Sequence, residues 1–151
     1  MRTCLFPGSF DPVTLGHVNI IERAVGLFDK LVIGIGSNSA KQSMFSVAQR
    51  IDWMQAIFAD NAKIEVAAYE GLTIDFCRKI NAQYILRGIR YVNDFEYERA
   101  IADMNNSLAP EIETIFLTSA TKHASISSTL VRDVIRNGGD ATQFLPKEVR
   151  Y

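Results

Sequence analysis

Residues 6–17 combine side-chain donors and turn residues in a way that suits phosphate binding. The stretch reads Phe-Pro-Gly-Ser-Phe-Asp-Pro-Val-Thr-Leu-Gly-His and lies between a short apolar run and a helical apolar pattern. Gly8 lets the backbone approach a ligand closely, and Thr14 is suited to cap a helix whose first turn holds His17. The unpaired N–H groups and the positive dipole end of that turn favour an anion, to which His17 adds a donor. Taken alone, a histidine at such a position is more often an ordinary, partly exposed helix residue than a ligand-binding one.

Cationic side chains occur in two other segments. Residues 86–90 read Leu-Arg-Gly-Ile-Arg, after an apolar run. The guanidinium groups of Arg87 and Arg90 suit bidentate phosphate binding, and Gly88 permits close approach of the backbone. Lys41 lies in a polar loop, residues 37–43, after another apolar run. Each of these cations could also be a solvated surface residue.

Hydroxyl groups cluster where a later helix is expected to begin. Residues 126–132 read Ile-Ser-Ser-Thr-Leu-Val-Arg. Hydroxyls beside the free N–H groups of a helix N-terminus form a second possible anion site. Simple helix capping is the alternative interpretation, but it requires only one of the three hydroxyls.

The elements that must position these segments follow from apolar periodicity. Apolar runs predict strands at residues 3–6, 31–36, 63–67, 83–86 and 113–117. Helical patterns alternate with them at residues 15–28, from a capping box at 46–49, after Gly71, at 94–107 and at 127–135, and Pro146 suits the start of a short final helix.

This alternation predicts the fold class and the place of the site. We expect an α/β fold with a five-stranded parallel sheet, arranged as a single doubly wound, Rossmann-like domain over residues 1–151. In such folds ligands bind at the carboxyl ends of the strands, near the point where the strand order reverses. The polar and cationic segments described above all follow predicted strands, in agreement with that rule.

Composition narrows the possible partners. The chain has 151 residues, 48% of them hydrophobic and 22% charged, with a net charge of −1. A nearly neutral balance argues against an extended nucleic-acid surface, which needs a basic face. No apolar run reaches the roughly 18 residues of a membrane span, and no signal peptide is recognised, so a cytoplasmic location is expected. Cys4 and Cys77 show no metal-ligand spacing.

Two motifs resemble the signature of the nucleotidyltransferase superfamily. Thr14-x-Gly16-His17 resembles its first half, and Ile126-Ser-Ser-Thr-x-x-Arg132, more than 100 residues later, its second half. The Pro-Gly-Ser-Phe-Asp-Pro string at 7–12, Arg-Gly-Ile-Arg at 87–90 and Asp-Phe-Glu-Tyr-Glu at 94–98 resemble one branch, the bacterial phosphopantetheine adenylyltransferases. The resemblance covers essentially the whole chain. It departs at Ser9, where the family usually has Thr, at His123, where an aromatic residue often occurs, and in a shorter C-terminal helix.

The resemblance implies an enzyme that transfers the AMP moiety of ATP to 4′-phosphopantetheine in coenzyme A biosynthesis. The products would be dephospho-coenzyme A and pyrophosphate. No Cys, Lys or Ser has an evident partner base, so direct in-line attack without a covalent intermediate is expected. Mg²⁺ would arrive with ATP, because no cage of protein carboxylates is visible. The family resemblance also implies a homohexamer.

Four residues are expected to serve catalysis. His17 is assigned to the α-phosphate of ATP, Ser9 and Lys41 to the phosphate of the acceptor, and Arg90 to the β- and γ-phosphates. The expected ATP site comprises Ser9, Phe10, His17, Gly88, Ile89, Arg90, Glu98, His123, Ala124, Ser125, Ile126, Ser127, Ser128 and Thr129. The expected acceptor site comprises Ser9, Lys41, Thr73 and Arg87.

Two other hypotheses stay open at this point. One is another adenylyl- or cytidylyltransferase of the same superfamily with a different acceptor, although such enzymes usually lack the Asp-Phe-Glu-Tyr-Glu run. The other is a non-catalytic nucleotide-binding module. The presence of His17, Lys41 and Arg90 together weighs against that module, because a sensor could lose any of them.

Overall fold

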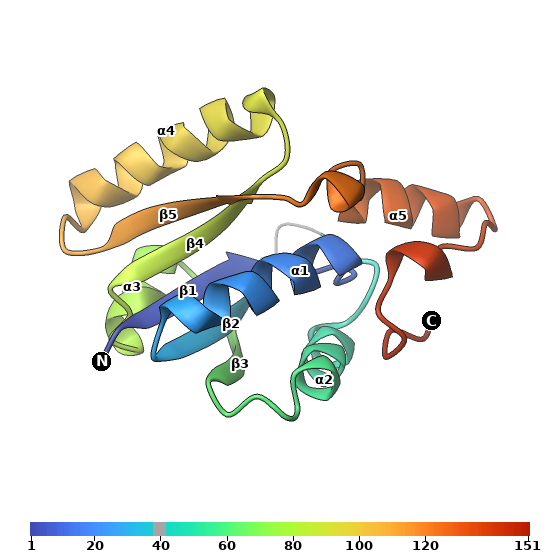
Figure 1. Cartoon of the computed structure of the whole chain (residues 1–151), viewed down its shortest axis with the longest axis horizontal. Helices are drawn as coiled ribbons and strands as arrows, with labels where there is room; N and C mark the ends of the chain where they lie inside the picture. The colour runs from blue at the N-terminus through green and yellow to red at the C-terminus, as the bar shows by residue number, and fades with distance from the viewer. Residues whose placement is uncertain (38–41) are drawn as a thin grey trace.

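The computed structural model describes residues 1–37 and 42–151, and its described strands form one parallel sheet (Figure 1). The strands are β1 (Thr3–Gly8), β2 (Lys30–Gly36), β3 (Ile64–Tyr69), β4 (Tyr84–Ile89) and β5 (Glu113–Thr118). Their order in the sheet is β3-β2-β1-β4-β5, with all pairs parallel. The predicted α/β fold with a five-stranded parallel sheet is therefore confirmed.

Helices connect successive strands, as parallel pairing requires. They are α1 (Leu15–Ala24), α2 (Val47–Ile57), α3 (Thr73–Lys79), α4 (Val92–Leu108) and α5 (Ser128–Arg136). Short 3-10 turns follow at Val25–Leu27, Thr121–His123 and Thr142–Phe144. The turn at Val25–Leu27 contains Gly26, and it replaces the last residues of the longer helix expected over 15–28.

Both faces of the sheet are covered, which is why its strands read as continuous apolar runs. On β1, Cys4 faces the larger core cluster, which also contains Ile21 of α1 and Met54 of α2. The next residue, Leu5, faces the opposite cluster together with Phe76 of α3. Alternate residues of one strand thus contact helices on opposite faces, and the doubly wound arrangement follows (Figure 1).

The point at which the strand order reverses lies between β1 and β4. From β1 the chain first moves outward through β2 and β3, and then returns to β4 and β5 on the other side. The segments after β1 and β4 therefore lie side by side at the carboxyl edge, where α/β folds bind ligands.

Strand β4 is longer than the sequence predicted. The expected strand ended at Leu86, with 87–90 as a loop, but Arg87, Gly88 and Ile89 pair with residues of β5. Arg87 borders a cleft and Gly88 has no side chain, so these two residues interrupt the apolar run and gave no strand signal, although Ile89 beyond them is buried. Arg87 and Gly88 are thus held by the sheet itself.

The expected helix at Pro146 is wrong. The helical turn lies before it, at Thr142–Phe144, where Asp140 Oδ1 accepts a hydrogen bond from the Thr142 N–H at 2.9 Å. At Pro146 one turn forms, with the Val149 N–H donating to the Pro146 carbonyl at 3.1 Å, while Val149 itself is buried in the core.

Candidate active site

Two adjoining pockets lie at the carboxyl ends of the strands. The first, of about 660 Å³, is called the Tyr69 chamber. The second, of about 610 Å³, is called the His17 chamber. The two chambers share Pro7, Gly8, Ser9, Arg87 and Glu98. A pair of pockets with a common wall can hold two substrates whose reacting groups meet at that wall.

His17 is oriented by a reciprocal capping box at the start of α1. The Thr14 N–H donates to His17 Nδ1 at 3.0 Å, and the His17 N–H donates to Thr14 Oγ1 at 3.4 Å. Because Nδ1 accepts a backbone proton, the neutral ring must carry its own proton on Nε2. His17, which lines the His17 chamber, is therefore assigned as an Nε2–H donor.

The surroundings keep His17 uncharged. Burial, and to a smaller extent the positive charges of Arg87 and Arg90, together lower the pKa of His17 from 6.5 to about 4. At neutral pH the ring is thus a neutral hydrogen-bond donor, which is suited to contacting an anion without transferring a proton.

The segment between β1 and α1 has an unusual backbone conformation. Phe10 has φ of 47°, in the left-handed region that non-glycine residues rarely adopt. Its ring packs edge-on against His17, with ring centroids 5.0 Å apart. A Cβ atom on Gly8 would lie 3.0 Å from the Phe10 ring, so a larger residue at this position would push the ring away from its place beside His17. The phenyl ring thus packs against the imidazole and restricts its position at the start of α1.

Arg90 is held at the His17 chamber by Asp94. The Arg90 amide donates to Asp94 Oδ2 at 3.0 Å, and Arg90 Nε donates to the same oxygen at 3.2 Å. Burial opposes ionisation of Asp94, but hydrogen bonds from the Arg90 and Tyr91 amides and the Arg90 charge lower its pKa overall. The sequence analysis gave Asp94 no role, although its i,i+4 spacing from Arg90 indicated this pair.

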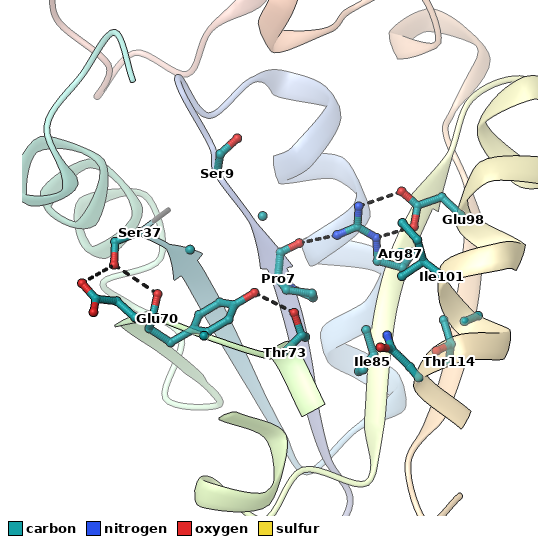
Figure 2. A pocket seen from close by; sticks show the side chains of 16 residues that line it. Pro7, Ser9, Ser37, Glu70, Thr73, Ile85, Arg87, Glu98, Ile101 and Thr114 are labelled. Carbon is teal, nitrogen blue, oxygen red and sulfur yellow. Dashed lines mark hydrogen bonds and ion pairs between the residues drawn. The ribbon is translucent and has the colours of Figure 1, made fainter. Parts of the chain in front are cut away.

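Arg87 joins the two chambers through a bidentate ion pair with Glu98 (Figure 2). Arg87 Nε and Nη2 donate to the two carboxylate oxygens of Glu98 at 2.8 and 2.7 Å. Its Nη1 donates to the Pro7 carbonyl at 2.6 Å. The sequence analysis put Arg87 with the acceptor and Glu98 with ATP, whereas the structure makes them one unit in the common wall. Removing either partner would leave a largely buried charge unpaired.

The Tyr69 chamber is lined by residues from the strands of the sheet and from α3 and α4 (Figure 2). The hydroxyls of Tyr69 and Thr73 are hydrogen-bonded at 3.0 Å, and the Tyr69 ring stacks on Phe76 at a centroid distance of 4.7 Å. Of the expected acceptor residues, Ser9, Thr73 and Arg87 line this chamber. Sequence reasoning missed Ser37, Tyr69, Glu70, Ile101 and Asn105, because isolated residues of these types carry no motif.

Most of the expected ATP residues line the His17 chamber. Those that do so are Ser9, Phe10, His17, Gly88, Arg90, Glu98, His123, Ile126, Ser127, Ser128 and Thr129. Ile89, Ala124 and Ser125 do not line it, and Ile89 is a buried strand residue. Lys41 lies outside the described residues.

The hydroxyls at the start of α5 are already engaged within the protein. Ser127 Oγ caps the helix by accepting from the Leu130 N–H at 3.1 Å, and Ser128 Oγ donates to the Pro12 carbonyl at 2.8 Å. Thr129 Oγ1 accepts from Arg132 Nη2 at 3.2 Å. These bonds fix the helix start beside the loop after β1. The donors left for an anion are the first-turn amides of Ser128 and Thr129 and the hydroxyl protons of Ser127 and Thr129, which act only as acceptors in these bonds.

The described residues offer no group of three or more His, Cys, Asp or Glu side chains that could hold a metal ion. The carboxylates nearest the His17 chamber, Asp94 and Glu98, are both engaged by arginines. Within the described part of the chain, no helix is long and apolar enough to cross a membrane.

Comparisons with known proteins place the chain in a family. Residues 5–134 match a family model described as cytidylyltransferase-like. Phosphopantetheine adenylyltransferase from Flavobacterium psychrophilum is 52% identical over 150 residues, covering 99% of both chains. The enzyme of that name from Flavobacterium johnsoniae is 50% identical, covering 99% of this chain and 98% of the relative. The chain belongs to the phosphopantetheine adenylyltransferase family. The resemblance drawn from its motifs is thereby confirmed, and the chain is a nucleotidyltransferase.

A solved structure supports the fold at a greater distance. The bifunctional NMN adenylyltransferase/ADP ribose pyrophosphatase from Francisella tularensis superposes with a TM-score of 0.74 at 19% identity. The match covers 95% of this chain and 44% of the Francisella chain, so the present chain corresponds to less than half of that protein. At this identity the similarity is one of fold alone.

The depressed pKa of His17 predicts a pH-dependent stability. Between about pH 4 and 6.5 the unfolded chain binds a proton at His17 that the folded protein does not. The free energy of unfolding should therefore fall as the pH falls through this window. His17→Gln keeps the capping-box acceptor but cannot titrate. Urea unfolding at pH 7 and pH 5 should show a smaller loss for His17→Gln than for the wild type. Equal losses would contradict the assigned neutral imidazole.

Proposed function

We propose that this protein transfers the adenylyl group of ATP to 4′-phosphopantetheine, giving dephospho-coenzyme A and pyrophosphate in a reversible step of coenzyme A biosynthesis. The observation that carries the proposal is the pair of chambers meeting at Ser9 and Arg87, one rich in anion donors and the other partly apolar. The names of the relatives at 52% and 50% identity support the same substrates.

ATP is proposed to bind in the His17 chamber. Arg90 and the first-turn amides of α5 are donors to the β- and γ-phosphates, and His17 Nε2–H is the donor to the α-phosphate. The 3-10 turn that contains His123 lies against the start of α1, because a Cβ atom on Gly16 would be only 3.8 Å from the His123 carbonyl oxygen.

The acceptor is proposed to bind in the Tyr69 chamber. Ile85 and Ile101 provide apolar wall for an extended arm, and Thr73 and Asn105 provide polar contacts for its amides. The phosphate end would reach the common wall at Ser9, which is exposed to the cleft. Lys41 is proposed to contact the same phosphate, as the sequence indicated.

The chemical step needs alignment and charge stabilisation more than proton transfer. An oxygen of the acceptor phosphate attacks the α-phosphorus of ATP, a new P–O–P bond forms, and the bond to the β-phosphate oxygen breaks. Pyrophosphate leaves with the bonding electron pair. The attacking oxygen is already anionic, so no general base is needed. His17 stabilises the charge that develops on the α-phosphate, and the two chambers hold the reactants in line.

Mg²⁺ is proposed to enter as part of the nucleotide substrate. Asp94 and Glu98 each neutralise an arginine in the site, so neither carboxylate is offered as a ligand in this arrangement. Phosphate oxygens of the nucleotide would then take the place of the carboxylate ligands that proteins often provide for Mg²⁺.

Pyrophosphate release from MgATP tests the proposed reaction directly. We expect release with 4′-phosphopantetheine, and none with nicotinamide mononucleotide, pantetheine lacking the phosphate, or no acceptor. Addition of EDTA should stop the release. A titration with ATP alone serves as a binding control. Turnover with nicotinamide mononucleotide alone would indicate a different acceptor, and ATP binding without any turnover would support the non-catalytic module.

We propose that the protein assembles as a homo-oligomer, with a hexamer as the expected form. Support comes from an apolar stripe on α4, where Tyr97 and Met104 are 69% and 68% exposed and Leu108 continues the same face. Light scattering on the purified protein should give a mass near six chains, and Met104→Glu should lower it. A monomeric wild type would contradict this proposal.

A further inference from the structure

The loop between β1 and α1 is fixed at three of its backbone carbonyls by groups from other elements. Arg50 of α2 donates from Nη1 to the Ser9 carbonyl at 2.7 Å. The Asp11 carbonyl accepts from Arg132 of α5 at 2.8 Å. The Pro12 carbonyl accepts from Ser128 Oγ at 2.8 Å. Phe10, which has the left-handed conformation, lies in the middle of these contacts. A costly backbone conformation persists only where its surroundings enforce it.

Arg50 is the most buried of these groups. The residue is 2% exposed. Besides the Ser9 carbonyl, its Nε donates to the Phe45 carbonyl at 3.1 Å and its Nη2 donates to Ser43 Oγ at 3.4 Å. A buried guanidinium is costly unless its donors are satisfied. Arg50 makes no direct contact with the reacting groups proposed above, so catalysis does not explain its burial.

Asp11, in the loop after β1, makes further hydrogen bonds between that loop and the segment before α2. It is 5% exposed, and its two carboxylate oxygens accept from the amides of Met44 and Phe45 at 2.8 and 2.9 Å. Arg50 is therefore hydrogen-bonded both to the loop after β1 and to the segment before α2. Asp11, which lies in the loop after β1, is hydrogen-bonded to the same segment before α2. The two charges are compensated by backbone dipoles and by each other's field, without forming a direct ion pair among the described residues.

We propose that Arg50 and Asp11 are positioning residues for the adenylyl transfer, and that they act by holding Ser9 at the wall between the two chambers. This inference rests on the proposed function. Arg50 fixes the Ser9 carbonyl and with it the backbone that carries the Ser9 side chain, and Asp11 stabilises the turn after Phe10. Neither side chain touches substrate, so their effect on the reaction passes through Ser9.

A double-mutant cycle separates this role from simple stabilisation. We expect Arg50→Gln to lower kcat/KM for 4′-phosphopantetheine by about ten- to a hundredfold, because small displacements at a reacting centre are costly. In a Ser9→Ala background the same change should cost less than about threefold, since coupled residues are not additive. Phe58→Leu, a buried substitution at the other end of α2, is the control. Its loss of thermal stability should leave KM unchanged and give equal factors in both backgrounds.

Hydrogen exchange of the peptide covering residues 9–14 gives a readout that does not depend on the reaction. Exchange should accelerate in Arg50→Gln and Asp11→Asn, and not in Phe58→Leu. If Arg50→Gln does not fold, Arg50→Lys replaces it, because lysine keeps the charge but cannot serve Ser9, Ser43 and Phe45 together. Additive losses in the cycle, or unchanged exchange at 9–14, would overturn the inference. An inactive wild type with accelerated exchange in the variants would instead contradict only the proposed reaction.

Discussion

The reciprocal bond between Thr14 and His17 is the contact on which the rest of the site depends. It starts α1 at the point where the strand order reverses, and it satisfies two backbone amides that a helix start would otherwise leave open. The same bond fixes the imidazole tautomer, because a ring nitrogen that accepts a backbone proton leaves Nε2 protonated. One local contact thus determines helix register, ring orientation and the chemical character of the donor.

Electrostatics around this contact keep the histidine neutral while two guanidinium groups remain beside it in ion pairs. Arg87 and Arg90 lie close enough to lower the pKa of His17, yet each is held by a carboxylate, Glu98 or Asp94. Such pairs contribute modest stability at exposed positions, but here they set the direction of two guanidinium groups at the chamber walls. A site built in this manner stabilises a polyanion without a catalytic base, as transfer between phosphates requires.

The sequence predicted the architecture well because it is encoded locally. Alternating apolar runs and helical patterns defined the sheet, and Thr14 and the Ser46–Gln49 capping box marked two helix starts that the structure contains. It failed where polar residues belong to regular structure, as at Arg87 in β4, whose pairing depends on a distant strand. The sequence also did not predict the contacts of Arg87 with Glu98 and of Arg50 with the Ser9 carbonyl, because these residues meet only once the sheet has formed.

The central claim is that His17 acts on the transition state as a neutral donor and not as a general binding group. Its most direct test is to measure kcat and the ATP dissociation constant together for His17→Ala. The account predicts a fall in kcat on the order of 10²–10³, typical of losing one oxyanion donor, with ATP affinity nearly unchanged. A variant that keeps near-normal kcat, or that loses ATP binding in proportion to its rate, would contradict it.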